Sequence, residues 1–127
     1  EDNVIFPGGI ERREIHKYYD CADAFILCNR TWNSKIEGLP NVAIESMSRG
    51  TPVIGSRDSG TQELIQEGVN GYLVDSEDID DIARKIEQAF TNKSKLTSMG
   101  DSAKLHVMKN FSFQSMKSNY LKLVRDE

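Results

Sequence analysis

Four short, uninterrupted apolar runs place the strongest constraint on how this chain can fold. They occupy residues 4–6, 24–27, 52–54 and 71–74. Each run is continuous rather than alternating in polarity, which is typical of strands that are buried on both faces of a parallel sheet. Segments with helical spacing lie between the runs, the first of them around Ile15, Tyr18 and Tyr19. The alternation predicts an α/β fold, a partial Rossmann-like, doubly wound parallel sheet of about four strands with right-handed crossovers.

The helix expected after the second run has a face of small residues. Ala43, Ser46, Met47 and Gly50 recur there at three- and four-residue intervals, so this helix can lie close against the sheet. We expect Gly50 to end it, because the following Thr51 and Pro52 lead into the next strand.

Helices are also expected after residue 74, where no further strand pattern occurs. Their apolar positions are Ile79, Ile82, Ala83, Ile86, Ala89 and Phe90 in the first, Leu96, Met99, Ala103 and Val107 in the second, and Phe113, Met116, Tyr120, Leu123 and Val124 in the third.

The composition predicts one ordinary globular domain over residues 1–127. The chain is 38% hydrophobic and 28% charged, and its net charge of −4 provides no positive field for nucleic acid or an anionic membrane. No apolar run approaches the roughly 20 residues that span a bilayer, and no export signal is recognisable at residues 1–3. We expect a soluble, unexported chain in which the two cysteines stay reduced.

The segment of residues 37–45 carries the clearest chemical pattern. Glu37 precedes an expected helix and Glu45 lies one turn inside it, while Gly38 permits close approach of a ligand and Pro40 suits the first helical turn. The amides of Leu39, Asn41 and Val42 are then expected at a helix N-terminus beyond the carboxyl end of a strand. This arrangement predicts a phosphate site.

Two carboxylates beside a phosphate suggest a ligand that also carries hydroxyl groups. Ionised Glu37 and Glu45 accept hydrogen bonds only, and sugar and ribose hydroxyls are matching donors. A nucleotide sugar has hexose hydroxyls, a diphosphate and a ribose in that order. One glutamate can therefore hold each end of it.

The E-x7-E pattern within the run EGLPNVAIESMSRGTPVI resembles the C-terminal, donor-binding half of retaining GT-B glycosyltransferases of the GT4 type, the glycosyl transferases group 1. Residues 3–8 and 19–27 look like the third and fourth strands of that half, and residues 60–74 look like the segment leading into its last strand. The resemblance covers about the first 90 residues, and the terminal helices fit in pattern only.

The resemblance implies a role for each candidate residue. Glu37 would be the catalytic-site acid that binds the transferred sugar, Glu45 would bind the ribose, and the backbone from Gly38 through Leu39, Asn41 and Val42 would meet the sugar and diphosphate. Gly9, in the loop of residues 7–10, falls where the family contacts the nucleobase. The implied reaction moves a hexose from a nucleoside diphosphate sugar to a glycan, lipid or small-molecule acceptor, without a metal or other cofactor. The implied location is the cytoplasm, with the parent protein able to sit at the inner membrane face.

Two parts of the family pattern are not matched. The Arg and Lys that clamp the diphosphate precede the equivalent of residue 4 in the family, and the N-terminal acceptor domain has no counterpart here. We therefore expect the parent protein to be a hexosyltransferase and the isolated chain to be inactive. The family's sheet order also places two further strands between residues 4–6 and 24–27, so we expect the sheet edge to rearrange or to self-associate.

Other interpretations remain open. The fold can serve as a non-catalytic nucleotide-binding or interaction module, or as a GT-B sugar-nucleotide epimerase, although the acid and histidine arrangement of the latter is not found. The two glutamates can also be ordinary surface acids. Arg12 and Arg13 are expected to face solvent, and His16 and His106 are each expected at the surface or in edge packing rather than in catalysis.

Overall fold

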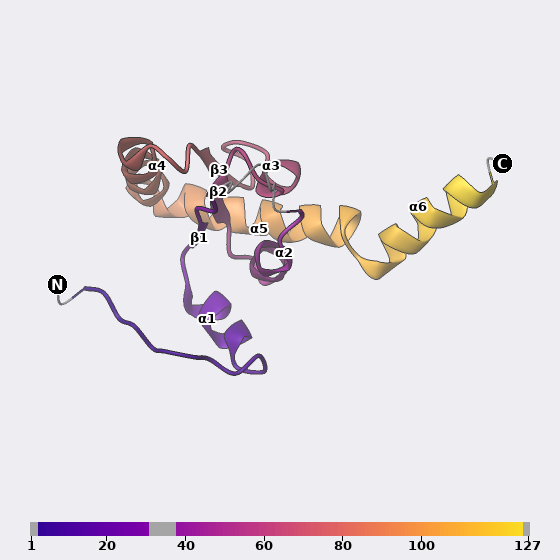
Figure 1. The fold of residues 1–127 in the computed structure, drawn as a ribbon, viewed down its shortest axis with the longest axis horizontal. Coiled ribbons are helices and arrows are strands. Elements are labelled where there is room, and N and C mark those ends of the chain that lie inside the picture. Colours follow the sequence, from indigo (N-terminus) through magenta and orange to yellow (C-terminus); the bar gives the residue numbers. More distant parts are fainter. Residues whose placement is uncertain (1–2, 31–37, 126–127) are drawn as a thin grey trace.

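The fold is a small parallel sheet with helices on both faces. The computed structural model describes residues 3–30 and 38–125. Strands β1 (Phe25–Leu27), β2 (Val53–Ser56) and β3 (Gly71–Val74) are parallel and adjacent in the order β1-β2-β3. Ile26 pairs with Ile54, which in turn pairs with Tyr72. The α/β class and the last three predicted strands are confirmed (Figure 1).

The strand predicted at residues 4–6 is wrong, and the described sheet has three strands instead of about four. Val4, Ile5 and Phe6 are 62%, 86% and 90% exposed and lie outside any described strand or helix. A strand of three residues is held by its ladder partners, and no described strand lies beside this segment to supply them. Its apolar character alone therefore misled the prediction.

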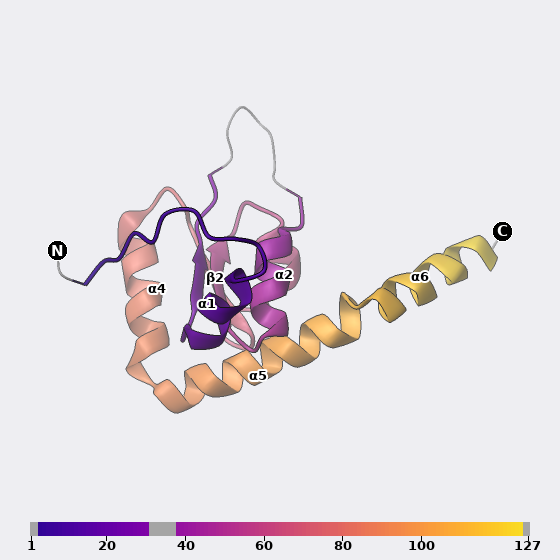
Figure 2. The ribbon, with the colours of Figure 1, turned by 90° about the horizontal axis from the view of Figure 1, so that it is seen from below.

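Two hydrophobic clusters cover the two sheet faces. Helices α2 (Asn41–Ser48), α3 (Thr61–Leu64) and α5 (Lys93–Asn110) enclose the first cluster, and α4 (Ile79–Thr91) with the start of α5 encloses the second. The first cluster contains Ala43, Met47, Val53, Leu64, Ile65, Ala103 and Val107, and the second contains Ile54, Tyr72, Val74, Ala89, Leu96 and Met99. In Figure 2, α4 and α2 lie on opposite sides of the sheet and α5 crosses one end of it.

The small face of α2 packs as predicted. Ala43, Ser46 and Met47 are fully buried, and the helix is followed by Gly50 at φ +84°, a left-handed conformation that favours glycine. Pro40 is the N-cap rather than a residue of the first turn, with ψ 118°. It therefore fixes the direction from which the chain enters α2, one residue earlier than predicted.

Helix α1 (Ile15–Cys21) is held against the end of α2 by side-chain hydrogen bonds. Arg49 donates two hydrogen bonds to the carboxylate of Asp20, one of them of 2.6 Å. The Thr51 hydroxyl donates to the carbonyl of Tyr19 over 2.7 Å, and the Tyr19 ring meets Phe25 edge-on at 5.5 Å. These contacts place α1 beside the first strand.

The C-terminal helices follow the predicted pattern unequally. All four predicted core positions of α5 are buried. Three of the predicted positions of α4 are exposed and lie off its buried stripe: Ile79 (74%), Phe90 (51%) and Ala83. Helix α6 (Phe113–Arg125) projects away from the sheet and buries none of its residues (Figure 1). Among the described helices, none has the length and apolar content to cross a membrane.

Candidate functional site

The candidate site lies where the chain leaves β1 and β2. Both strands end at the same edge of the parallel sheet, so the loops that follow them are neighbours. Residues 38–40 lead into α2, and residues 57–60 connect β2 to α3. Glu37, the predicted sugar ligand, lies outside the described residues.

The start of α2 presents backbone donors. The carbonyl of Pro40 accepts hydrogen bonds from the amides of Ala43 at 3.1 Å and Ile44 at 3.3 Å. The amides of Asn41 and Val42 find no acceptor within residues 3–30 and 38–125, and both residues are exposed. Because helix N-termini carry a partial positive charge, an anion placed at this turn would be stabilised.

Glu45 lies on the same side of α2, one turn further along. Positions 41, 42 and 45 share a face at helical spacing, so a ligand on the first turn can extend towards Glu45. The side chain is half-buried and lines a pocket of about 230 Å³ between α1 and α2. The pocket is lined by Arg12, Ile15, His16, Tyr19, Glu45, Ser48 and Arg49.

Tyr19 and Glu45 both line this pocket, and they interact electrostatically. Burial, and secondly the charge of Glu45, raise the pKa of the Tyr19 hydroxyl. Arg12 and His16 are exposed, as predicted, yet both line the pocket beside Glu45. Their position beside Glu45 was not recognisable from the sequence, because Arg12 lies just before α1 and His16 lies in its first turn, about 30 residues before Glu45.

Hydroxyl groups fix the loop between β2 and α3. Thr61 Oγ1 donates to the carbonyl of Ser56 at 2.5 Å, and Ser59 Oγ lies 2.7 Å from Thr61 Oγ1 and 3.3 Å from the same carbonyl. Ser56 Oγ donates in turn to the carbonyl of Asn29, beyond β1, at 2.8 Å. Hydrogen bonds thus join residues within this loop and also connect the end of β2 to the residues that follow β1.

The structure brings most of the predicted site together. Gly38, Leu39, Asn41 and Val42 form one loop and the first turn, with Glu45 beside them. Gly9 lies in the extended segment before α1, where an added Cβ would meet nothing within 4 Å, so it is not packed against the other site residues.

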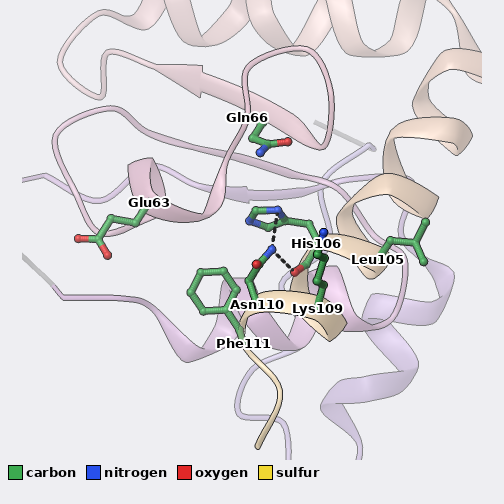
Figure 3. A pocket seen from close by; sticks show the side chains of 7 residues that line it. All are labelled: Glu63, Gln66, Leu105, His106, Lys109, Asn110 and Phe111. Carbon is green, nitrogen blue, oxygen red and sulfur yellow. Dashed lines mark hydrogen bonds between the residues drawn. The ribbon is translucent and has the colours of Figure 1, made fainter. Parts of the chain in front are cut away.

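A second hollow, of about 630 Å³, lies between α3 and the last turns of α5. Figure 3 shows it lined by Glu63, Gln66, Leu105, His106, Lys109, Asn110 and Phe111. The rings of His106 and Phe111 are tilted to each other with their centroids 5.7 Å apart, and His106 also contacts Asn110. The Nε2 atom of His106 is buried and has no hydrogen-bond partner among the described residues. His106 is thus partly buried against Phe111 at the end of α5, in agreement with the surface or edge packing expected for it.

Comparison with known proteins decides the family. The family model described as "Glycosyl transferases group 1" matches residues 1–106, which include both strand ends and all of α2. This chain belongs to the group 1 glycosyl transferases. The resemblance noted in the sequence is therefore confirmed.

Relatives of this glycosyl transferase chain support that assignment. Spore coat protein SA of Bacillus subtilis is 30% identical over 122 residues, which are 95% of this chain and 31% of the relative. Sucrose-phosphate synthase from Thermosynechococcus elongatus superposes with a TM-score of 0.81 at 25% identity, over 99% of this chain and 31% of that one. Anabaena HepE in complex with UDP superposes with a TM-score of 0.76 at 20% identity, over 91% and 31%, and shows the shared fold. The chain thus spans about a third of these proteins.

Proposed function

We propose that this chain is the donor-binding part of a retaining glycosyltransferase that transfers a hexose from a nucleoside diphosphate sugar. The observation that carries the proposal is the first turn of α2. Its Asn41 and Val42 amides have no described acceptor, and Glu45 lies on the same side one turn away. An anion flanked by a hydroxyl-bearing ring matches that order of donors and acceptor.

Each part of the ligand has a matching group. The diphosphate lies against the amides from Gly38 to Val42, and the ribose hydroxyls donate to the carboxylate of Glu45. Glu37, eight positions before Glu45, takes the hexose hydroxyls. The UDP held by HepE, a protein with the same fold, supports a nucleoside diphosphate as the leaving group.

The chain's contribution to the reaction is orientation and electrostatic stabilisation. When the bond between the sugar and the diphosphate breaks, negative charge grows on the departing phosphate. The fixed amide dipoles at the start of α2 stabilise that charge without reorganising. Glu37 and Glu45 hold the two ends of the donor, so that the anomeric carbon is presented to an acceptor bound by the remainder of a longer protein. No metal or other cofactor is required in this scheme, and the isolated chain does not turn over.

Ligand-observed NMR tests the proposal, because saturation transfer detects weak binding. The panel contains UDP, GDP, UDP-glucose and GDP-mannose, each with the wild-type chain and with Glu45→Gln. We expect transfer to ribose and hexose protons of at least one nucleotide sugar, reduced in the variant. Saturation transfer to no member of the panel, or transfer that Glu45→Gln leaves unchanged, contradicts the proposed donor site.

A further inference from the structure

We infer that Gly60 positions the donor-binding turn of α2, because the absence of a side chain there sets how closely the two site loops approach. The inference rests on the proposed function, and it adds a positioning residue that does not itself touch the donor. Gly60 lies at the N-terminal end of α3, and Gly38 lies two residues before the N-cap of α2.

The contact between the loops is made by backbone atoms. A Cβ built on Gly60 would meet the carbonyl oxygen and carbon of Gly38 and the nitrogen of Leu39, the last at 2.7 Å and the Gly38 atoms closer still. Real Cβ atoms essentially never approach another heavy atom within 3.0 Å. Any side chain at position 60 must therefore displace the Gly38 to Leu39 peptide. Gly60 has φ −57°, an ordinary helical value, so close approach alone requires glycine.

The backbone around Gly60 is held in place more tightly than the backbone of Gly38 and Leu39. Gly60 is buried between Ser59 and Thr61, whose hydroxyls bond to each other, at 2.7 Å, and to the carbonyl of Ser56. Gly38 and Leu39 are exposed. A clash is therefore relieved by movement of the peptide that leads into α2, and the amides of Leu39, Asn41 and Val42 move with it.

The displacement has a defined functional consequence. Several tenths of an ångström at the Gly38 peptide change the direction of the amides that the diphosphate would meet. Misplacements of about 1 Å cost on the order of a hundredfold in rate in preorganised sites. For binding we expect Gly60→Ala to raise the Kd for a nucleotide sugar about tenfold.

Gly100→Ala provides a matched control. A Cβ on Gly100 would likewise run into a backbone carbonyl oxygen, that of Gly50, and would touch Pro52 at 3.4 Å. This contact lies before β2 and joins α2 to α5, at the end of the sheet opposite to the site. Both variants therefore introduce the same kind of clash, but only one of them displaces the site.

The experiment combines amide NMR spectra with titration of UDP-glucose and GDP-mannose. In the free protein, Gly60→Ala should shift the resonances of Leu39, Asn41 and Val42, while Gly100→Ala leaves them in place. In the titration, Gly60→Ala should weaken binding about tenfold and Gly100→Ala less than twofold. If Gly60→Ala does not fold, Ser59→Ala serves instead: it adds no volume and removes the contacts of the Ser59 hydroxyl with Thr61 and with the carbonyl of Ser56, which loosens the loop around Gly60. It should weaken binding roughly two- to fivefold.

The outcomes separate this inference from the proposed function. If the wild type binds and Gly60→Ala binds equally well, the inference is overturned while the donor site stands. The same holds if Gly60→Ala does not fold and Ser59→Ala binds as the wild type does. Unshifted Leu39, Asn41 and Val42 amides in Gly60→Ala also overturn it, whether or not a ligand binds. If the wild type binds neither nucleotide sugar, the proposed function fails, and shifted amides in Gly60→Ala then support the contact between the loops alone.

Discussion

Replacement of Glu45 by glutamine tests the ribose-binding role with little change in shape. The substitution keeps the side-chain volume and removes the negative charge that the ribose hydroxyls would meet. A hydrogen bond to a charged group contributes about 1.5–3 kcal/mol. Because Glu45 is half-buried instead of fully enclosed, the lower end applies. A loss of about 1.5 kcal/mol corresponds to roughly a tenfold rise in Kd.

The assay compares UDP with inorganic pyrophosphate, because only UDP carries a ribose. Glu45→Gln should weaken the binding of UDP about tenfold. Its affinity for pyrophosphate should stay unchanged or rise slightly, because a negative charge has been removed. Glu87→Gln, at an exposed position of α4, is the control and should bind both ligands as the wild type does. Equal weakening of UDP and pyrophosphate by Glu45→Gln would refute the assigned role, since the residue would then act on the phosphate region.

Three further predictions concern the scaffold around the site. Met47 of α2 is fully buried in the first hydrophobic cluster, so Met47→Ala should lower the free energy of unfolding by about 2–5 kcal/mol in urea titrations, and a change below about 1 kcal/mol would contradict the packing. Hydrogen bonds from Arg49 lower the pKa of Asp20 below its ordinary 3.8; the stabilisation is present above that value and is lost as pH falls through the lowered pKa. Asp20→Asn should therefore flatten the acid side of the stability profile in denaturant melts, and an unaltered profile would argue against the pair. Glu45→Gln should also lower the pKa of Tyr19, measured by NMR of labelled tyrosine, and an unchanged value would place Glu45 elsewhere.

The strands and the internal helix faces follow from sequence because they depend on local spacing. The runs that became β2 and β3 are buried by the flanking helices, and every predicted core position of α5 is buried, whereas β1 lies at the edge of the described sheet with Ile26 43% exposed. Residues 4–6 carry the same apolar signal, but a strand needs a neighbour and the described sheet supplies none beside them. The predicted apolar stripe of α4 wrongly included Ile79, Ala83 and Phe90 for a similar reason. Helical periodicity does not tell how far the surface that buries a helix extends.

The candidate site was predictable in its chemistry and less so in its support. The order of Gly38, Pro40 and Glu45 predicts a helix start with a nearby acid, and the structure has both. The contact between Gly38 and Gly60 joins positions 22 residues apart, and nothing in the spacing signals it. The glycine at position 60 was the only available sign, and its meaning depends on the backbone that approaches it.

Mapping of amide shifts during titration with UDP-glucose and GDP-mannose tests the central claim most directly. The account predicts that one of these ligands shifts the amides of Leu39, Asn41 and Val42 first and most strongly, together with Glu45. Largest shifts elsewhere, for example around His106 and Phe111 between α3 and α5, would contradict a donor site at the start of α2.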